Sequence, residues 1–512
     1  MTFFITTAID YTNGVPHIGH AYEKVLTDAI ARYRRMKGEE VFFLTGVDQH
    51  GQKVQQSAQK QGVAPSEFVA GLTEKFLALW KKLDISYDRW AATTEPVHKR
   101  CVQAMLQLLW DNGDFYKARQ TGHYSVRQEQ FLTDKERGPD GEFGPEWGDV
   151  VVIEEENYYF KLARHRQWLL DLIDARSAAG RPFVVPEFRV AELRNAVEKL
   201  AGDLCISRPK SRLEWGIELP FDSDFVTYVW FDALSNYVSF AGYDPAPGAD
   251  QSLFRSRWPA IHVIGKDIMI PPHGIYWPIM LKACGFADDD IPSLLVHGWW
   301  NISGAKMSKS LGNSVDPDVL ADTFGVAATR YYLLSDIAIG RDADFSEERL
   351  IQRYNGDLAN SLGNLLNRSL SMAKRYREGA LRKPESSPLA GFVSDKVADY
   401  GRRMDAFETQ AALESAWEII VRCNAYVEET APWKLAKDPA SADKLDEVLY
   451  TLAEALRVIS ILITPFIPAS ADAIRLQLAW DGPVHMDQCG WGALADGHRL
   501  GDPVPVFPRI ET

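Results

Sequence analysis

Residues 3–9 read Phe3-Phe4-Ile5-Thr6-Thr7-Ala8-Ile9, and a turn that carries two histidines, Pro16-His17-Ile18-Gly19-His20, follows them. The first stretch is short and mostly apolar, as a buried strand is, and residues 22–36 have the apolar spacing of a helix that stops at Gly38. A strand, a turn and a helix in this order place both histidines at a helix N-terminus, where backbone N–H groups and the helix dipole favour an anion. The segment therefore predicts a phosphate-binding turn in an α/β fold.

A second segment far downstream carries two lysines on a loop rich in glycine and serine. It reads Lys306-Met307-Ser308-Lys309-Ser310-Leu311-Gly312-Asn313, and the apolar run at 294–300 leads into it. Lysines on such a loop are mobile point charges for polyphosphate, and histidines can stabilise phosphate oxygens that gain charge in a transition state. Alone, each motif also fits an ordinary turn or a solvated basic loop. Together, in this order, they favour a nucleotide site.

The composition indicates a large globular protein of a reducing compartment. With 512 residues and 46% hydrophobic content, the chain can bury several cores. No apolar run approaches the roughly 18 to 20 residues of a membrane span, and the N-terminus lacks the positive region of a signal peptide. The five cysteines are scattered, which disfavours a disulfide framework. We therefore expect a cytoplasmic enzyme with no membrane partner.

The net charge of −14 disfavours nucleic-acid binding that is driven by overall charge. It leaves room for RNA binding, because a locally basic face can dock on a phosphate backbone while the remaining surface is acidic.

Strand-like and helical runs alternate along the chain, which predicts a parallel sheet with helices on both faces. After the first strand and helix, the runs that carry this pattern are residues 40–46, 66–80, 97–110, 225–230, 260–265 and 294–297. Ligands in such sheets bind at the carboxyl ends of the strands. We therefore expect the histidine turn, Gly265-Lys266-Asp267 and Gly298-Trp299 to converge.

The predicted fold class is α/β: a Rossmann-like parallel-sheet domain, split by an insertion and followed by an all-α helix bundle. Helical segments at roughly 347–380, 392–433 and 441–464 indicate the bundle, and Pro465 and Pro468 end the last of them. The predicted regions are the first half of the sheet domain, the insertion, the second half, the lysine-loop region and the helical domain, at residues 1–115, 116–222, 223–300, 301–346 and 347–512.

The two motifs, in this order and context, resemble the signature of class I aminoacyl-tRNA synthetases. Further stretches extend the resemblance to the methionyl-tRNA synthetase family over nearly the whole chain: 8–16, 45–51, 228–233, 264–267 and 273–278. The resemblance implies an ATP-dependent methionine–tRNA ligase. Such an enzyme converts L-methionine and ATP to methionyl-adenylate and transfers the methionyl group to the 3′-terminal adenosine of tRNA(Met), initiator and elongator, releasing pyrophosphate and AMP.

The resemblance also implies site residues for the nucleotide. The catalytic groups would be His17, His20, Lys306 and Lys309. The residues that bind ATP would be Gly19, His20, Gly265, Asp267, His297, Gly298, Trp299, Met307, Ser308 and Lys309. Mg²⁺ is expected on the phosphates, although no side chain can be assigned to it.

A methionine pocket should be apolar and aromatic, because a thioether packs well on ring edges, and it needs a carboxylate for the substrate ammonium. By resemblance, Asp48 is that carboxylate, helped by the backbone near Ala8 and Ile9. The pocket would be formed by Tyr11, Trp230, Ala233, Leu234, Tyr237, Ile268, His273, Tyr276 and Trp277. Several relatives have Pro at the position of Leu234, which we interpret as a change of packing. Ordinary core packing is the alternative role for the tryptophans.

The helical domain would read the anticodon, and residues 301–346 would contact the tRNA stem. Asn364 and Arg368 lie four residues apart, so their side chains are neighbours on one helix face, and Trp433 follows Pro432 at an expected helix end. By resemblance, Trp433 stacks on the CAU anticodon while Asn364 and Arg368 read base edges. A buried tryptophan and a solvated helix face are the alternative.

Two absences are also expected. Many relatives hold zinc with paired Cys-x-x-Cys knuckles in the insertion, but the corresponding stretch at 122–131 contains no cysteine, and His123 alone cannot supply about four ligands. We therefore predict no structural zinc and no other metal site. Many relatives also carry a C-terminal module that dimerises, whereas this chain ends at Thr512, which leads us to expect a monomer.

Competing interpretations remain at the level of the sequence. Other nucleotidyltransferases share the histidine turn, but they are usually shorter and lack a long helical C-terminal third. A catalytically inactive RNA-binding paralogue would have lost the histidines or the lysines, and both are present. Among synthetases of other specificity, the valyl, leucyl and isoleucyl enzymes carry a larger editing insertion, and a cysteinyl enzyme needs zinc-ligating cysteines.

Overall fold

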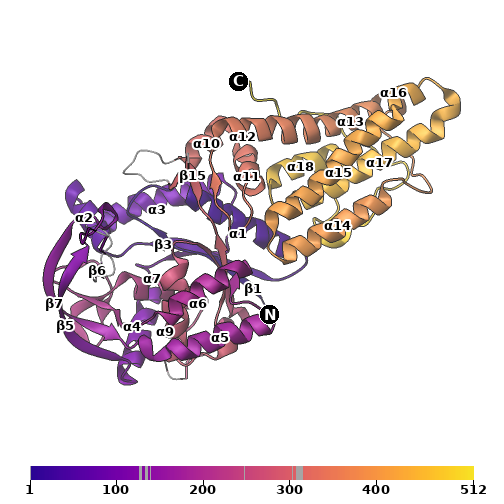
Figure 1. The fold of residues 1–512 in the computed structure, drawn as a ribbon. Helices are drawn as coiled ribbons and strands as arrows, with labels where there is room; N and C mark the ends of the chain where they lie inside the picture. The colour runs from indigo at the N-terminus through magenta and orange to yellow at the C-terminus, as the bar shows by residue number, and fades with distance from the viewer. Residues whose placement is uncertain are drawn as a thin grey trace.

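The structure is a computed structural model that describes residues 2–125, 130–132, 137–138, 140–246, 248–302, 304–306 and 315–511. Figure 1 shows two parts: a body built on a sheet, and an arm of long helices that extends from it. The predicted fold class, a parallel sheet followed by a helical domain, is confirmed. No helix among the described residues has both the length and the apolar character that a membrane span requires.

A parallel sheet forms the centre of the body, in the order β2-β3-β1-β13-β14-β8, with β4 beside β3. Every neighbouring pair in it is parallel. Its strands are β1 (Phe3–Thr7), β2 (Asp10–Tyr11), β3 (Val41–Asp48), β4 (Arg89–Ala92), β8 (Val184–Val185), β13 (Ala260–Gly265) and β14 (Ser293–His297). The strands predicted near residues 3, 40, 260 and 294 are therefore confirmed.

Both faces of this sheet are buried, because apolar side chains alternate between two cores. Ile5, Phe43 and Val263 face one core, and their neighbours Phe4 and Phe42 face the other. The first core is completed by α1 (Ile18–Met36), α3 (Pro65–Lys82) and α11 (Val326–Ser335). The second is completed by α4 (Pro96–Asp111), α5 (Arg166–Ala178), α6 (Val190–Glu198), α7 (Val229–Ser239) and α9 (Trp277–Ala283). Shorter helices are α2 (Gln52–Gln61), α8 (Ser252–Arg257) and α10 (Pro317–Phe324).

Helix α1 begins at Ile18, four residues before the predicted start. The His17 side chain accepts a hydrogen bond from the Gly19 N–H, and the His20 side chain accepts one from the His17 N–H. This reciprocal pair satisfies two backbone donors that a helix start leaves without partners. The histidines of the turn therefore also form the N-terminal cap of α1.

Within the predicted insertion, 116–222, α5, β8 and α6 belong to the sheet body, and the other described strands form antiparallel sheets. Its larger sheet has the order β6-β5-β7-β9, formed by β5 (Phe115–Ser125), β6 (Gln130–Leu132), β7 (Val150–Phe160) and β9 (Leu204–Cys205). A smaller sheet joins β10 (Ser207–Pro209), β12 (Asp222–Thr227) and β11 (Glu218–Leu219). The prediction that residues 225–230 resume the parallel sheet is wrong: this strand pairs antiparallel with β10 and β11. It ends at Thr227, and Trp230 belongs to α7.

The arm is helical, with boundaries that differ from those predicted. Its helices are α12 (Glu347–Arg353), the π-helix η8 (Tyr354–Gly363), α13 (Asn364–Arg377), α14 (Ala390–Asp405), α15 (Thr409–Thr430), α16 (Pro432–Leu435), α17 (Ala442–Leu462) and α18 (Pro468–Gln477). The segment predicted at 392–433 contains α14, α15 and the start of α16, because Phe407 adopts φ 63° and reverses the chain. Pro468, expected only to end a helix, occupies the first turn of α18.

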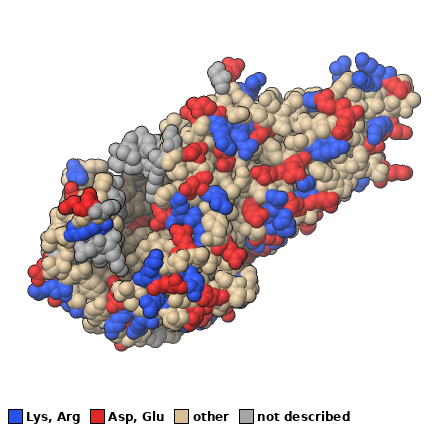
Figure 2. Space-filling model, in the orientation of Figure 1, with Lys and Arg blue, Asp and Glu red and all other residues tan. Residues whose placement is uncertain are grey.

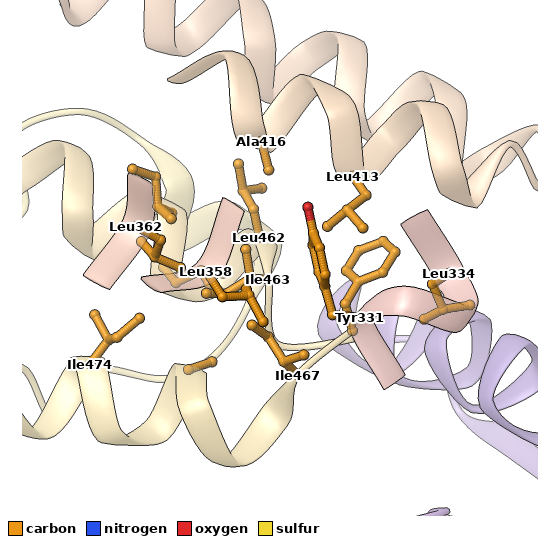
Figure 3. Close-up of a cluster of buried hydrophobic side chains, with 14 of the residues drawn as sticks. Tyr331, Leu334, Leu358, Leu362, Leu413, Ala416, Leu462, Ile463, Ile467 and Ile474 are labelled. Carbon is orange, nitrogen blue, oxygen red and sulfur yellow. The ribbon is translucent and has the colours of Figure 1, made fainter. Parts of the chain in front are cut away.

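Buried side chains join the arm to the body. Figure 3 shows Tyr331 and Leu334 of α11 among Leu413 of α15 and apolar residues of η8, α17 and α18. Beside them, the fully buried Arg330 donates to the Asp28 carboxylate on α1 and to the backbone oxygens of Leu83, Pro465 and Phe466. One guanidinium thus ties the sheet body to the arm. A small sheet, β16-β15-β17, lies between the two (Ala305–Lys306, Trp300–Ile302 and Ala343–Asp344).

Candidate active site

A cavity of about 810 Å³ lies at the carboxyl ends of β1, β3, β13 and β14. Figure 2 shows the surface hollowed between the insertion and the rest of the body. The predicted site residues that line the cavity are Ala8, Ile9, Tyr11, His17, Gly19, His20, Asp48, Trp230, Ala233, Leu234, Tyr237, Gly265, Asp267, Ile268, His273, Tyr276, His297, Gly298 and Trp299. Segments that are up to about 290 residues apart in the chain thus meet at one sheet edge, as expected for a parallel sheet.

The histidine turn presents two imidazoles to this cavity. The ring centroids of His17 and His20 lie 3.8 Å apart. Each Nδ1 accepts a backbone hydrogen bond of 3.1 Å, so a neutral ring carries its proton on Nε2 and can donate from there to an anion. Gly19 leaves room for this arrangement, since a Cβ there would lie 2.9 Å from Cε1 of His17 and the imidazole would have to shift. The turn is therefore built to hold hydrogen-bond donors at a helix N-terminus.

The part of the cavity lined by Gly298 and Trp299 is fixed by a close approach of two loops. A Cβ on Gly298 would lie 1.9 Å from the Arg341 backbone oxygen, so only glycine fits. The Trp299 backbone N–H donates to Asp342 at 2.9 Å, and its indole N–H donates to Asp267 at 3.2 Å. Lys266 pairs with Asp342 at 2.6 Å and lies 4.0 Å from the Trp299 ring centre. The indole is thereby held as a flat wall.

Aromatic side chains and the neutral imidazole of His273 form another wall of the cavity. The backbone oxygen of Ile268 is 2.9 Å from Nδ1 of His273, so this nitrogen donates, and Nε2 accepts from the Tyr237 hydroxyl at 2.8 Å. Burial lowers the pKa of His273 to about 4. The ring is therefore neutral at pH 7, and its tautomer is set by these two partners. A neutral, apolar wall suits an uncharged side chain and disfavours a charged one.

Trp277 differs from its prediction, because it does not line the cavity. It is buried behind the wall, where its indole N–H donates to Nε2 of His262 at 3.0 Å. Nδ1 of His262 then carries the proton and donates to the Thr6 hydroxyl at 2.8 Å. Burial holds the pKa of His262 well below its usual value. Trp277 therefore supports Tyr237, whose ring stacks on His262 with centroids 3.9 Å apart.

The lysine loop is described only at its start. Lys306 ends β16, which pairs antiparallel with β15, so the backbone brings this loop next to the strand that follows Trp299. Met307, Ser308 and Lys309 lie outside the described residues.

The predicted anticodon residues lie on the arm. Asn364 and Arg368 are on α13, with Asn364 exposed and Arg368 half-buried, and Trp433 is half-buried on α16. The Arg368 guanidinium carbon is 5.7 Å from the Trp433 ring centre, and Arg368 also pairs with Glu428 at 2.8 Å. Figure 1 places α13 and α16 together on the arm, away from the body. The structure thus joins Arg368 and Trp433 in one surface cluster.

Comparison with known proteins finds family models that match both the sheet body and the helical arm. The family model described as tRNA synthetases class I (M) matches residues 3–141 and 148–370, and the anticodon binding domain of methionyl tRNA ligase matches 377–512. The chain belongs to the methionyl-tRNA synthetase family. It is 42% identical to the methionine–tRNA ligase of Deinococcus radiodurans, across 99% of this chain and 74% of that protein. It is 39% identical to the Bacillus subtilis ligase, across 100% and 78%.

Solved methionyl-tRNA synthetases have the same fold. The Mycobacterium tuberculosis enzyme in complex with methionyl-adenylate superposes with a TM-score of 0.91 at 37% identity, over 99% of this chain and 100% of that one. Its apo form gives a TM-score of 0.85 at 34% identity, over 100% and 98%. The sheet body and the helical arm are thus arranged as in those methionyl-tRNA synthetases.

Sequence reasoning missed a buried charge cluster beneath the synthetase cavity. The Lys24 ammonium donates to Asp10 at 2.6 Å, to Glu23 at 3.0 Å and to the Ala8 backbone oxygen at 3.0 Å. Glu23 in turn lies 3.1 Å from His297. Burial raises the pKa of Asp10 to about 7, although Lys24 opposes it. Residues 23 and 24 lie three and four positions after His20, so helical spacing could have placed them on the same face.

The insertion of this methionyl-tRNA synthetase fold also contributes to the cavity, which the sequence did not reveal. The contributing side chains are Gln120, Tyr159, Asp203, Leu204, Cys205 and Arg208, together with Lys53 from α2. Arg208 is buried, and its guanidinium carbon lies 4.5 Å from the Tyr228 ring centre. No group of three or more His, Cys, Asp or Glu side chains that could hold a metal occurs among the described residues.

Proposed function

We propose that this protein is a methionine–tRNA ligase that activates L-methionine with ATP and charges tRNA(Met). The observation that carries the proposal is the single cavity in which a histidine turn on a helix N-terminus faces an uncharged aromatic wall. Membership of the methionyl-tRNA synthetase family supports the same reaction. Alternative activities, a different nucleotidyltransferase or a synthetase of other specificity, are tested by the experiment below.

In adenylate formation, the methionine carboxylate attacks the α-phosphorus of ATP and pyrophosphate leaves. This chemistry depends mostly on positioning and on stabilising charge. His17 and His20 donate from Nε2 to phosphate oxygens, in the orientation that the α1 cap fixes. Asp267 and the Gly298-Trp299 segment hold the adenosine, with Gly265 and His297 beside them. Lys306 and Lys309 close over the β- and γ-phosphates, and Met307 and Ser308 of the same loop bind ATP. Mg²⁺ on these phosphates would neutralise part of their charge.

Methionine selection follows from the opposite end of the cavity. Asp48, buried at the end of β3, accepts the substrate ammonium beside the backbone of Ala8 and Ile9. The thioether packs against rings, which sulfur contacts favourably. The side chains proposed for this contact are Tyr11, Trp230, Ala233, Leu234, Tyr237, Ile268, His273 and Tyr276. Because His273 is neutral, the aromatic wall places no charge beside the thioether.

In the second step, a ribose hydroxyl of the terminal tRNA adenosine, the 2′-hydroxyl in this class, attacks the adenylate and AMP leaves. The anticodon is read at a distance by Trp433, stacking on a base, with Asn364 and Arg368 at base edges. The contact between the Arg368 guanidinium and the Trp433 ring supports a shared binding surface. We propose initiator and elongator tRNA(Met) as the substrates.

We also propose the roles of the regions, the absence of structural zinc, the oligomeric state and the cellular location. Residues 1–115 and 223–300 act as the catalytic domain, 116–222 as its insertion, 301–346 as the stem-contact region and 347–512 as the anticodon domain. The insertion holds no structural zinc, which is supported by the partners of His123: Arg137 at 3.0 Å and the Phe143 ring at 5.2 Å. Residues 126–129 of that stretch lie outside the described residues. The enzyme acts as a monomer in the cytoplasm, which light scattering and cell fractionation test.

ATP–pyrophosphate exchange with each of the twenty amino acids tests the proposed function. We expect exchange that depends strongly on methionine. Exchange that depends on another amino acid would assign a different specificity, and exchange with none would indicate a different nucleotidyltransferase. Zinc analysis after purification without chelators tests the metal proposal separately: one zinc per chain would refute it.

A further inference from the structure

A buried carboxylate lies behind the amino-acid wall, between two histidines. Asp232 on α7 is 1% exposed. Its Oδ2 is 2.7 Å from Nδ1 of His50, and its Oδ1 is 2.8 Å from Nε2 of His98. A carboxylate can only accept, so both rings donate to it. Burial alone would raise the pKa of Asp232, but the two imidazoles hold it at about 2, and the group is ionised at pH 7.

This carboxylate joins three elements, of which α4 and α7 also pack together in the second core. It belongs to α7, His50 belongs to the loop after β3, and His98 belongs to α4. Nδ1 of His98 is also 2.8 Å from the Ser239 hydroxyl at the end of α7. Both ends of α7 are therefore fastened to α4 through one imidazole.

Asp232 and its partner His50 are each close in sequence to a residue that lines the cavity. On α7, Trp230 and Ala233 lie within two residues of Asp232, and both line the cavity. His50 follows Asp48 by two residues, and its backbone N–H lies 3.4 Å from an oxygen of the Asp48 carboxylate. The His50 ring is thus bonded to α7 while its backbone contacts the residue proposed to bind the ammonium.

We propose that Asp232 is a positioning residue that sets the distance between the Asp48 carboxylate and the α7 wall, and thereby selects the length of the amino-acid side chain. This inference rests on the proposed methionine site. An ammonium group at Asp48 and a thioether on the α7 wall are two fixed points, and the Asp232–His50 bond links the elements that carry them. Loosening that bond widens the range of accepted side chains.

The test is Asp232→Asn, compared with wild type in exchange assays with methionine, ethionine and norleucine. Asparagine turns one acceptor into an N–H₂ group that faces a histidine donor. We expect KM for methionine to rise on the order of tenfold to a hundredfold, while KM for ATP changes by less than about twofold. The preference in kcat/KM for methionine over ethionine and norleucine should fall.

Two variants of the partner histidine keep the test decisive if Asp232→Asn folds poorly. His98→Gln retains an amide N–H that can donate to Asp232, whereas His98→Phe fills the space without a donor. We expect methionine KM near wild type for the first variant and a raised methionine KM for the second. Asp446→Asn is the matched control, since Asp446 is a buried carboxylate paired with Arg377 on the arm, and its exchange kinetics should not change.

The outcomes separate the two levels of inference. If wild type shows no methionine-dependent exchange, the proposed function fails. If wild type is methionine-dependent, the inference is overturned by an unchanged methionine KM in Asp232→Asn, or by methionine and ATP KM values that rise together. Equal methionine KM values for His98→Gln and His98→Phe would also overturn it, because a purely structural role would not depend on the donor.

Discussion

At the scale of single residues, the site depends on which atoms carry protons. His17 and His20 accept at Nδ1 through the helix cap, and His273 donates at Nδ1 and accepts at Nε2. Backbone groups set all but one of these bonds. The chemistry of the cavity is therefore fixed by local folding before any ligand arrives.

Capping and catalysis by the histidine turn can be separated. His17→Asn keeps a side-chain acceptor at the N-cap, so the free energy of unfolding should change by less than about 1 kcal/mol. Adenylate formation should slow on the order of a hundredfold, because asparagine cannot place the Nε2 donor. Rapid-quench exchange and urea denaturation measure the two effects.

Lys309→Ala and His20→Ala should also slow adenylate formation, with methionine binding nearly unchanged. Normal exchange kinetics in these variants would contradict the roles proposed for His17, His20 and Lys309 in adenylate formation.

Protonation of His273 makes stability depend on pH. Its pKa falls from 6.5 to about 4 on folding, so the unfolded chain binds more protons between these values. The stabilisation is complete above about pH 6.5 and is lost as pH falls towards 4, by roughly 3 kcal/mol in total. Urea denaturation at pH 7 and pH 5 should show a larger loss in wild type than in His273→Gln. Equal losses would mean that His273 keeps an ordinary pKa in the folded state.

At the scale of elements, the local apolar pattern predicted the type of each segment, strand or helix. Contacts with distant segments determined which sheet each strand joins. The runs near residues 40, 260 and 294 were predicted as strands of the parallel sheet because apolar residues there are nearly continuous. Residues 225–227 show a similar pattern, yet they pair antiparallel with β10 and β11. The turn between α14 and α15 has Phe407 at φ 63°, where a sequence signal would have required glycine.

The anticodon role proposed for the cluster on α13 and α16 can be tested without affecting the chemistry. Trp433→Ala should weaken aminoacylation by about tenfold to more than a hundredfold, the effect of one lost stacked base at roughly 1–3 kcal/mol. Trp433→Phe keeps a ring for stacking and should retain most activity. Exchange without tRNA should be unchanged in both, since the cluster lies on the arm. Normal charging by Trp433→Ala, or a parallel loss of exchange, would make Trp433 a core residue.

At the scale of the whole molecule, the motifs predicted that distant segments converge, and most of their residues line one cavity. The motifs did not predict the contacts that hold these segments in place. Asp232 and His98 are 134 residues apart, and His50 and Asp232 are 182 apart. No local spacing encodes such pairs. Trp277 shows the same difficulty. The family pattern suggested that Trp277 lines the pocket, whereas in the structure it packs behind Tyr237.

The joint between body and arm should be costly to break. Arg330→Met removes one of the two guanidinium partners of the buried Asp28 carboxylate, the other being Arg32, and it leaves three backbone oxygens without their donor. We expect a loss of about 3–5 kcal/mol in the free energy of unfolding. Arg422→Ala, which removes a half-exposed pair with Glu429, should cost less than about 1 kcal/mol. Similar losses for both variants in urea denaturation would contradict a special role for Arg330.

Helix α1 limits how far the joint between body and arm can tilt before the histidine turn is displaced. Its 19 residues make a rod about 28 Å long, with the histidine turn at one end and Tyr33, bonded to Gly401 of α14, near the other. Tilting such a rod by about 2° about its far end moves the near end by about 1 Å, and a misplacement of that size can cost a hundredfold in rate. The joint between body and arm must therefore keep its angle to within a degree or two while the arm binds a large RNA.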